Sequence, residues 1–410
     1  MMTCPRRTLL LLVIVGAAPG IAADWPQFLG PRRDGASAET GLRQTWPAGG
    51  PPVVWQRPVG EGFSAPAVQG ERLILFHRQG DREVVECLDA GTGKERWKFA
   101  YATQYEDDFG KGNGPRATPV IAGGRVFTLG ADGWLHCLDL QSGQKIWGRS
   151  ITADYQVPRN FFGIGSSPLL EGDLLLVNVG GKDAGIVAFA RDTGREAWRT
   201  TRDGASYASP VSATIDGERH AIFFTREGIV LLDPASGAVR FQMRWRARGN
   251  ASVNATSPVL IDDWVFFSAS YETGAILLRV RKGGVETLWK NDDVLSSHYS
   301  NIVHSGGFLY GFEGRQERGA ELRCVELATG KVKWTRAGFG CGATILADGN
   351  LIVLTERGDL VLVEASPAGY HERARSHVFD RLPCRANLAL ANGLLYGRDG
   401  SKLVCWNLRK

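Results

Sequence analysis

Short apolar strands separated by glycine-containing turns follow one another along the chain, and one stretch of this pattern recurs. The segment "CLDAGTGKERW" (87–97) returns as "CLDLQSGQKIW" (137–147), "AFARDTGREAW" (188–198), "LLDPASGAVRF" (231–241) and "CVELATGKVKW" (324–334). Looser copies are "VRKGGVETLW" (280–289) and "VEASPAGYHERA" (363–374), and "PPVVWQRPVG" (51–60) keeps only the second half. In each full copy an apolar strand ends in a turn whose glycine takes a positive φ, and a strand with an aromatic residue follows. The repeat therefore predicts a series of β-hairpins.

A second repeated phrase predicts a further strand for each hairpin. It runs "FSAPAV" (63–68), "RATPVI" (116–121), "GSSPLL" (165–170), "YASPVS" (207–212) and "ATSPVL" (255–260), with weaker forms at 299–304, 341–346 and 384–390. Most copies are followed by a turn and another apolar strand, so one unit has four strands in about 40 to 53 residues, the period of a propeller blade. A lone hairpin is marginal in water, and we expect the tryptophan to dock each unit against the next.

The two ends of the chain complement each other. The segments 385–390, 393–398 and 402–408 form three strands without a fourth, whereas 53–59 resembles a fourth strand without its blade. We therefore expect an all-β protein with a single eight-bladed β-propeller over residues 53–410. In this propeller the N-terminal strand joins the C-terminal blade and closes the ring. Residues 24–52 form a lead-in segment before it.

The first 23 residues have the pattern of an export signal. Arg6 and Arg7 precede the apolar stretch 9–18, and "GIAA" before Asp24 offers a small-residue cleavage site after Ala23. A retained N-terminal anchor is the alternative, and the choice between Sec and twin-arginine export stays open. No other segment approaches the 18 apolar residues of a membrane-spanning helix. The sequence thus predicts a periplasmic or secreted protein with no transmembrane segment in the mature chain.

The charge balance argues against a nucleic-acid partner. The chain carries 48 basic and 43 acidic residues, and removal of residues 1–23 leaves 46 against 43, a net charge of +3. Such a mild excess without a strong basic run does not form a phosphate-binding surface. We expect a monomer whose partner is an envelope protein or a glycan.

The loops between the outer strand of one blade and the inner strand of the next carry the candidate binding residues. These loops gather around the axis of a propeller, and loops on a rigid scaffold commonly carry function. The candidates are Tyr105, Arg116, Arg159, Asn160, Phe161, Tyr207, Asn254, His298, Tyr299, Arg385 and Asn387. Aromatic rings beside arginine and asparagine suit a quinone with carboxylates, a sugar chain or a loop of a partner protein. Ordinary turn residues and loop-packing aromatics are the alternative interpretation.

Catalytic and metal motifs are not found in the sequence. The residues 106–108 (Glu-Asp-Asp) lack the spacing of a calcium loop, and we interpret them as a solvated acidic loop. The seven histidines are scattered, without H-E-x-x-H or C-x-x-C, and no G-x-S-x-G occurs. Cys87, Cys137, Cys324 and Cys405 recur at one place in the repeat and are expected in the core. Cys341 and Cys384 open adjacent inner strands, where a disulfide or two free thiols both remain possible.

The repeated D-x-x-[ST]-G-[KR]-x-x-W phrase resembles the tryptophan-docked repeats of the pyrroloquinoline-quinone-like propeller family. That family includes quinoprotein dehydrogenases and the BamB type of assembly protein. The segment 24–42, "DWPQFLGPRRDGASAETGL", is similar to the lead-in of exported members. For the dehydrogenases the resemblance implies a quinone over calcium, an aspartate base and a bridge between adjacent cysteines. This chain has no Cys-Cys pair and no segment that matches the aspartate motif, so we expect no cofactor.

The resemblance to the BamB type implies a docking platform, although no cysteine for lipid attachment follows the apolar stretch. Together these features predict an exported, non-enzymatic propeller that binds an envelope protein or glycan through the loops around its axis. The alternative is a dehydrogenase of alcohols or aldoses that depends on pyrroloquinoline quinone with calcium and has a reduced cofactor pocket.

Overall fold

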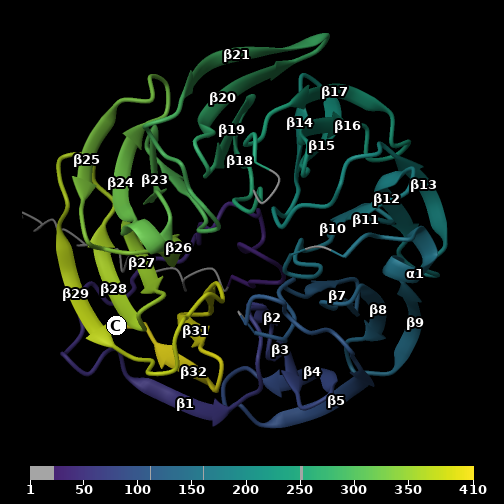
Figure 1. Ribbon diagram of the computed structural model, residues 1–410. Helices are drawn as coiled ribbons and strands as arrows, with labels where there is room; N and C mark the ends of the chain where they lie inside the picture. The colour runs from purple at the N-terminus through teal and green to yellow at the C-terminus, as the bar shows by residue number, and fades with distance from the viewer. Residues whose placement is uncertain (1–22, 111, 160, 250–252) are drawn as a thin grey trace, which may run out of the picture.

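The protein is a ring of eight antiparallel four-stranded sheets around a central axis (Figure 1). The computed structural model describes residues 23–110, 112–159, 161–249 and 253–410. The four strands of each sheet follow one another in the chain in seven of the eight blades, which confirms the predicted eight-bladed propeller.

The first four blades, counted along the chain, use strands β2 to β17. Blade 1 has β2 (Ala67–Gln69), β3 (Arg72–Gln79), β4 (Arg82–Asp89) and β5 (Glu95–Ala102). Blade 2 has β6 (Val120–Ala122), β7 (Arg125–Leu129), β8 (Trp134–Asp139) and β9 (Lys145–Ser150). Blade 3 has β10 (Leu169–Glu171), β11 (Leu174–Gly181), β12 (Ala184–Ala190) and β13 (Glu196–Thr200). Blade 4 has β14 (Val211–Ile215), β15 (Glu218–Phe224), β16 (Gly228–Leu232) and β17 (Val239–Arg244).

The remaining blades return to the start of the chain. Blade 5 has β18 (Val259–Ile261), β19 (Trp264–Ala269), β20 (Gly274–Arg281) and β21 (Gly284–Asn291). Blade 6 has β22 (Val303–Ser305), β23 (Phe308–Glu313), β24 (Glu321–Glu326) and β25 (Val332–Arg336). Blade 7 has β26 (Gly342–Ala347), β27 (Asn350–Thr355), β28 (Asp359–Glu364) and β29 (Glu372–His377). Blade 8 has β30 (Ala389–Ala391), β31 (Leu394–Arg398), β32 (Lys402–Asn407) and β1 (Val53–Pro58).

Blade 8 closes the ring with strands from both ends of the chain. Its order is β30-β31-β32-β1, and β1 pairs antiparallel with β32 so that Trp55 lies opposite Cys405. The helical elements of the described chain are α1 (Ile151–Tyr155) and the short 3-10 helix η1 (Gln316–Arg318). No helix in the described ranges is long and apolar enough to cross a membrane.

The repeated tryptophan docks one blade on the next at six of the eight junctions. Trp147 lies opposite Cys137 in blade 2, and its indole N–H donates to the backbone carbonyl of Arg191 in blade 3 at 2.9 Å. Equivalent bonds join Trp55 to Ala90, Trp97 to Leu140, Trp198 to Pro234, Trp289 to Leu327 and Trp334 to Ser366. These bonds confirm the docking role that the repeat predicts. The four cysteines at the shared repeat position are all buried in the core, as expected.

At five of these six junctions, the turn glycine of the following blade lies against the docked indole. Gly194 has φ +66°, and a Cβ atom there would come within 2.6 Å of the Trp147 ring. The same geometry recurs for Gly93, Gly143 and Gly237, where the gap is 2.4 to 2.7 Å, and more loosely at Gly330. Glycine is therefore required at this position for two reasons, the positive φ of the turn and the close approach of the ring.

Two blade junctions lack the tryptophan, and other aromatic residues replace it. At the repeat position of the tryptophan, blade 4 has Phe241 and blade 7 has Ala374. Between blades 4 and 5, Phe224 stacks with Trp245 and contacts the edge of Phe267, each with ring centroids 5.5 Å apart. Between blades 7 and 8, Phe379 meets Trp406 edge-on with ring centroids 5.7 Å apart. Aromatic contacts are therefore present at both junctions.

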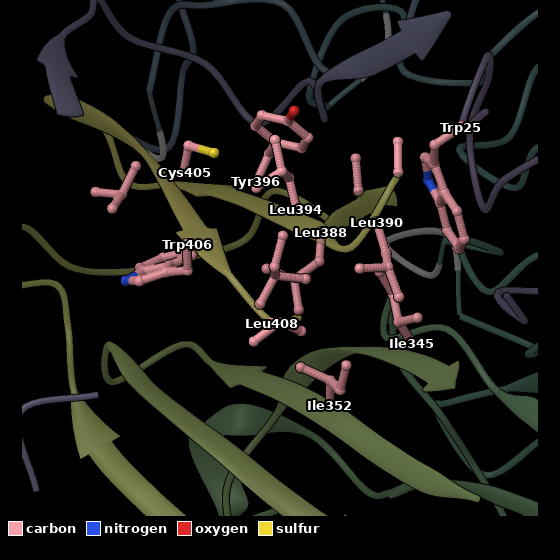
Figure 2. Close-up of a cluster of buried hydrophobic side chains, with 14 of the residues drawn as sticks. Trp25, Ile345, Ile352, Leu388, Leu390, Leu394, Tyr396, Cys405, Trp406 and Leu408 are labelled. Atoms are coloured by element: carbon pink, nitrogen blue, oxygen red, sulfur yellow. The ribbon is translucent and has the colours of Figure 1, made fainter. Parts of the chain in front are cut away.

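The lead-in segment binds across the inner strands like a strap. Trp25 is 1% exposed, pairs with Val68 and packs in the cluster with Leu390 and Ile345 (Figure 2). Hydrogen bonds from residues 25–43 reach six blades, at Val68, Ile121, Pro168, Pro210, Leu346 and Leu408. Because one segment holds so many inner strands, the lead-in contributes to ring closure from inside, while β1 closes it from outside.

Arg33 lies at the centre of this strap. Its guanidinium group is buried and donates to the carbonyls of Pro168 and Pro210, at the inner strands of two different blades. Burial lowers the pKa of Arg33 to about 9, and the carboxylate of Glu171 opposes this shift. The strap is therefore fixed by polar bonds as well as by the packing of Trp25.

The six described cysteines are all buried and free. Cys341 and Cys384 are therefore two thiols in the structure, which answers the question that their sequence positions left open. Burial raises the pKa of each thiol to about 12, so both are protonated at neutral pH.

Replacement of Gly194 by alanine should destabilise the protein more than replacement of Gly172. Both glycines have similar positive φ, +66° and +57°, but a Cβ at Gly172 meets nothing within 4 Å. Both substitutions therefore carry the same cost of an alanine at positive φ. Only the Cβ of Gly194→Ala would also clash with a docked tryptophan. We expect an additional loss of about 1–3 kcal/mol in the free energy of unfolding by chemical denaturation. Equal losses for the two variants would show that the indole contact does not constrain this turn.

Candidate functional site

A cavity of ≈ 220 Å³ lies at the axis, where the loops between successive blades converge. We call it the funnel cavity. Six of the predicted residues line it: Arg116, Tyr207, His298, Tyr299, Arg385 and Asn387. The rest of the lining comes from Phe28, Phe63, Phe162, Val253, Ala255, Tyr271 and residues 315–317. The sequence therefore identified part of a real cavity.

The other predicted residues lie elsewhere. Tyr105 and Arg159 line a neighbouring cavity, and Phe161 packs against Phe109 beside the funnel. Asn254 is buried and donates to the carbonyl of Thr225, so it has a structural role. Asn160 lies outside the described residues.

The strap separates the funnel cavity from the opposite face of the ring. Phe28 takes part in the lining of the funnel, whereas Gln27 and residues 31–34 line a cavity of ≈ 770 Å³ at the other ends of the inner strands. This second cavity includes Glu171 and residues 260–262, which end β10 and β18. Residues of the lead-in thus contribute to both cavities, and we refer to the lining of the funnel cavity as the cup.

Phe63 is the aromatic centre of the cup. The guanidinium groups of Arg116 and Arg385 each lie 5.8 Å from the centroid of its ring. Arg385 also lies 5.3 Å from the Tyr299 ring, and Arg116 lies 5.3 Å from the Tyr105 ring. Such cation–π contacts hold the long arginine side chains in place, so the aromatic surface is rigid.

The arginines of the cup are paired with acids. Arg116 contacts the carboxylate of Asp107 at 2.5 Å, and Arg385 contacts that of Glu356 at 3.3 Å. Arg315 contacts Glu317 at 3.2 Å. Because each positive charge is compensated nearby, the cup has an aromatic rather than an anion-binding character.

His298 is neutral and has a partner at each ring nitrogen. Its Nδ1–H donates to the Gln316 side-chain oxygen at 2.8 Å, and its Nε2 accepts from the Tyr271 hydroxyl at 2.9 Å. Burial lowers the pKa of His298. The imidazole therefore holds the two loops that carry Tyr271 and Gln316 together.

The sequence prediction missed Tyr271 and residues 315–317 for a topological reason. These residues lie in the loops between the second and third strands of blades 5 and 6. Antiparallel neighbours reverse direction at every turn, so these loops emerge on the same face as the loops between blades. Only the loops between blades were considered, although "SYETG" and "EGRQERG" carry the same kind of residues.

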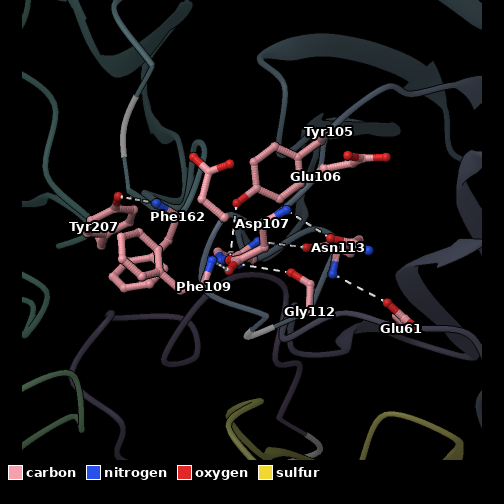
Figure 3. A network of polar contacts seen from close by, with 12 residues as sticks. Glu61, Tyr105, Glu106, Asp107, Phe109, Gly112, Asn113, Phe162 and Tyr207 are labelled. Atoms are coloured by element: carbon pink, nitrogen blue, oxygen red, sulfur yellow. Dashed lines mark hydrogen bonds and ion pairs between the residues drawn. The ribbon is translucent and has the colours of Figure 1, made fainter.

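Asp107 organises the long loop between blades 1 and 2 (Figure 3). Its carboxylate is buried and accepts from the backbone N–H of Phe109 at 2.9 Å, the Tyr105 hydroxyl at 3.3 Å and Arg116. The interpretation of residues 106–108 as a solvated acidic loop is therefore wrong for Asp107, because Arg116 and backbone donors replace water. Its neighbours Glu106 and Asp108 are exposed, as predicted.

An aromatic ridge leads from solvent into the funnel cavity. Phe109 is 51% exposed, and its ring centroid lies 5.4 Å from that of Phe162. Phe162 in turn lies 5.7 Å from Tyr207, ring centroid to ring centroid, and its backbone N–H donates to the Tyr207 hydroxyl oxygen at 2.8 Å. The loops of this ridge are joined by the 2.7 Å ion pair of Arg159 and Asp108.

A separate cavity of ≈ 460 Å³ lies beside the funnel, which we call the side cavity. Its wall contains Trp134, at the start of β8, together with Gln104, Glu106 and residues 157–159. Beneath it, Glu83 of β4 is fully buried and accepts from the backbone N–H of Ala131 at 2.9 Å and from the Tyr101 hydroxyl.

The donor set does not fit a calcium-held quinone. Asp107 and Glu356, two acids next to the cup, are engaged by arginines. Within the ranges that the structure describes, no three His, Cys, Asp or Glu side chains are grouped to hold a metal ion. Calcium prefers six to eight oxygen ligands, which the described residues of the cup do not supply.

The fold and the cup define a class, the tryptophan-docked β-propellers with a ligand-sized recess at the axis. A family model described as "Outer membrane protein assembly factor BamB" matches residues 80–336, more than half of the chain. The chain therefore belongs to this family of BamB-like, pyrroloquinoline-quinone-like propellers.

Individual relatives are distant. The outer membrane protein assembly factor BamB of Moranella endobia is 23% identical over 260 residues, which cover 60% of this chain and 63% of that protein. The chain thus spans less than two thirds of that relative.

Two solved structures share the fold. BamB from Moraxella catarrhalis has a TM-score of 0.60 at 16% identity and covers 87% of this chain and 97% of its own. The quinohemoprotein alcohol dehydrogenase from Comamonas testosteroni has a TM-score of 0.67 at 12% identity, and the match covers 93% of this chain and 80% of that enzyme. At these identities the likeness concerns the fold alone.

Glu83 should make the stability of the protein depend on pH. Burial raises the pKa of Glu83 to about 7, so the folded protein holds this proton more tightly than the unfolded chain. The stabilisation from this proton is fully present below the unfolded pKa of about 4.5. It is lost as the pH rises through 7, which lowers the free energy of unfolding by about 3 kcal/mol. Glu83→Gln should flatten this decline in chemical denaturation series, whereas Glu95→Gln, an exposed control on β5, should leave it. An unchanged slope in Glu83→Gln would contradict the assignment.

Proposed function

We propose that this protein is an exported, non-enzymatic propeller that docks an envelope protein through the aromatic ridge and the funnel cavity. The observation that carries the proposal is the continuous aromatic surface from exposed Phe109 through Phe162 and Tyr207 to the cup. Rigid aromatic side chains that remain exposed on loops are typical hot spots of protein interfaces.

The charge arrangement supports a protein partner over a small anionic ligand. The arginines of the cup are compensated by Asp107, Glu356 and Glu317, and both nitrogens of His298 are engaged. A general base needs an acceptor that is free to take a proton, and these groups are already bonded. The surface is therefore suited to burial against apolar side chains rather than to proton transfer.

The family supports the same proposal. Relatives such as the Moranella endobia protein are named as outer membrane protein assembly factors, and residues 1–23 have the pattern of an export signal. These features support our proposal of a location in the periplasm, or outside the cell, and of an envelope protein as the partner.

Removal of the exposed end of the ridge should abolish docking without unfolding the protein. Phe109→Ser deletes an interface ring that is 51% exposed, and Val239→Ser changes a 40% exposed residue on the outer strand of blade 4 as a matched control. We expect quantitative co-purification from the envelope fraction to recover one protein with wild type and Val239→Ser. Recovery with Phe109→Ser should fall at least about 30-fold, since interface hot spots contribute 2 kcal/mol or more. Identical recovery with both variants would contradict docking through the ridge.

The alternative predicted from the sequence is a dehydrogenase that depends on pyrroloquinoline quinone with calcium. It is tested by titration of the purified protein with pyrroloquinoline quinone and calcium, followed by tryptophan fluorescence and dye-coupled alcohol oxidation. We expect no saturable quenching at micromolar quinone, because no three His, Cys, Asp or Glu side chains are grouped to hold a metal ion among the described residues. Saturable quenching with turnover would replace the docking proposal by the enzymatic one.

A further inference from the structure

The side cavity next to the funnel contains an indole that the docking repeat does not use. Trp134 is 37% exposed, whereas the docking tryptophans Trp97 and Trp147 are each 9% exposed. It lies in the wall of the ≈ 460 Å³ cavity at the start of β8. The exposed part of this indole is not buried on folding and so does not stabilise the fold. Its position in a cavity wall is consistent with a binding role.

The orientation of Trp134 is set from behind. His136 stacks on the indole with an interplanar angle of 14° and centroids 5.7 Å apart, and Tyr101 meets it edge-on at 6.5 Å. Burial lowers the pKa of His136 to about 4, so this support is uncharged at physiological pH. These two rings support the indole from one side and fix its orientation, and we call its exposed surface the platform.

Polar groups surround this platform. Gln104 and Glu106 are exposed, and neither side chain forms a bond with another residue in the described parts of the chain. Ser150, the strand partner of Trp134, and Thr152 also line the cavity, and their hydroxyl groups lie 3.2 Å apart. Amide, carboxylate and hydroxyl groups together provide both donors and acceptors within one cavity.

The charges of the side cavity have no single sign. Arg159 is paired with Asp108 at 2.7 Å and also donates to the carbonyl of Glu106 at 2.9 Å. The acidic residues Glu106 and Asp132 also line the cavity. A phosphate or an acidic polymer would need an excess of unpaired cations, so the cavity disfavours an anionic ligand.

A pyranose ring matches this arrangement. One face of such a sugar presents C–H groups that pack on an aromatic ring, while its hydroxyl groups point outward to polar partners. We propose that the side cavity is a binding site for a neutral saccharide, stacked on Trp134 and hydrogen-bonded by Gln104 and Glu106. The site goes beyond the proposed function and does not require a protein in the funnel.

The proposal is tested by calorimetric titration of the purified full chain with chitotriose and maltotriose as neutral probes. A short uncharged peptide and inorganic phosphate serve as comparison ligands. We expect saturable binding of at least one trisaccharide in the millimolar range or tighter, and none of phosphate or peptide. Trp134→Ala and Gln104→Ala should each weaken it, Trp134→Ala by at least about tenfold, which is 1.4 kcal/mol.

Two controls separate this site from the funnel and from folding. Phe109→Ser changes the ridge and should leave saccharide affinity unchanged, and the thermal midpoints of the exposed-residue variants should stay near that of wild type. Absence of trisaccharide binding up to about 10 mM, a free energy weaker than about −3 kcal/mol, would overturn the proposal. Binding that survives Trp134→Ala, or a preference for the peptide, would overturn it as well.

Discussion

The structure depends on one contact that is repeated around the ring, an indole placed flat against the turn glycine of the next blade. In blade 2 the Trp147 N–H also satisfies the carbonyl of Arg191, so a single side chain supplies apolar area, shape and a hydrogen bond. A four-stranded blade has two faces and cannot bury both alone. Each blade is therefore stable only through its neighbours, and the contact with Gly194 sets how closely they approach.

A ring of such contacts must also close, and the chain achieves this twice. Outside, β1 completes blade 8 beside β32. Inside, the strap ties inner strands together through Trp25 and the buried guanidinium of Arg33. The same strap divides the axis, so that Phe28 takes part in the lining of the funnel cavity. The same segment therefore helps to close the ring and to shape the candidate site.

The rigid ring lets the loops on one face differ from blade to blade. The loop between blades 1 and 2 is organised by the buried carboxylate of Asp107. On one side this loop exposes Phe109 to solvent. On its other side lies the cavity of Trp134. Two surfaces of different chemistry, one aromatic and one mixed with polar groups, are thus carried by adjacent loops of one scaffold.

The sequence by itself determined the number of blades, the docking tryptophans and the closure by β1, because these depend on local turn chemistry and on a repeat that is visible in the chain. It also identified Arg116, Tyr207 and Arg385 as residues near the axis. Only the tertiary structure decided that Asn254 is structural and that Tyr271 reaches the cup. The physical reason is that loop positions on a propeller face depend on strand direction and on contacts between blades. Those contacts join residues far apart in the chain, and no local pattern records them.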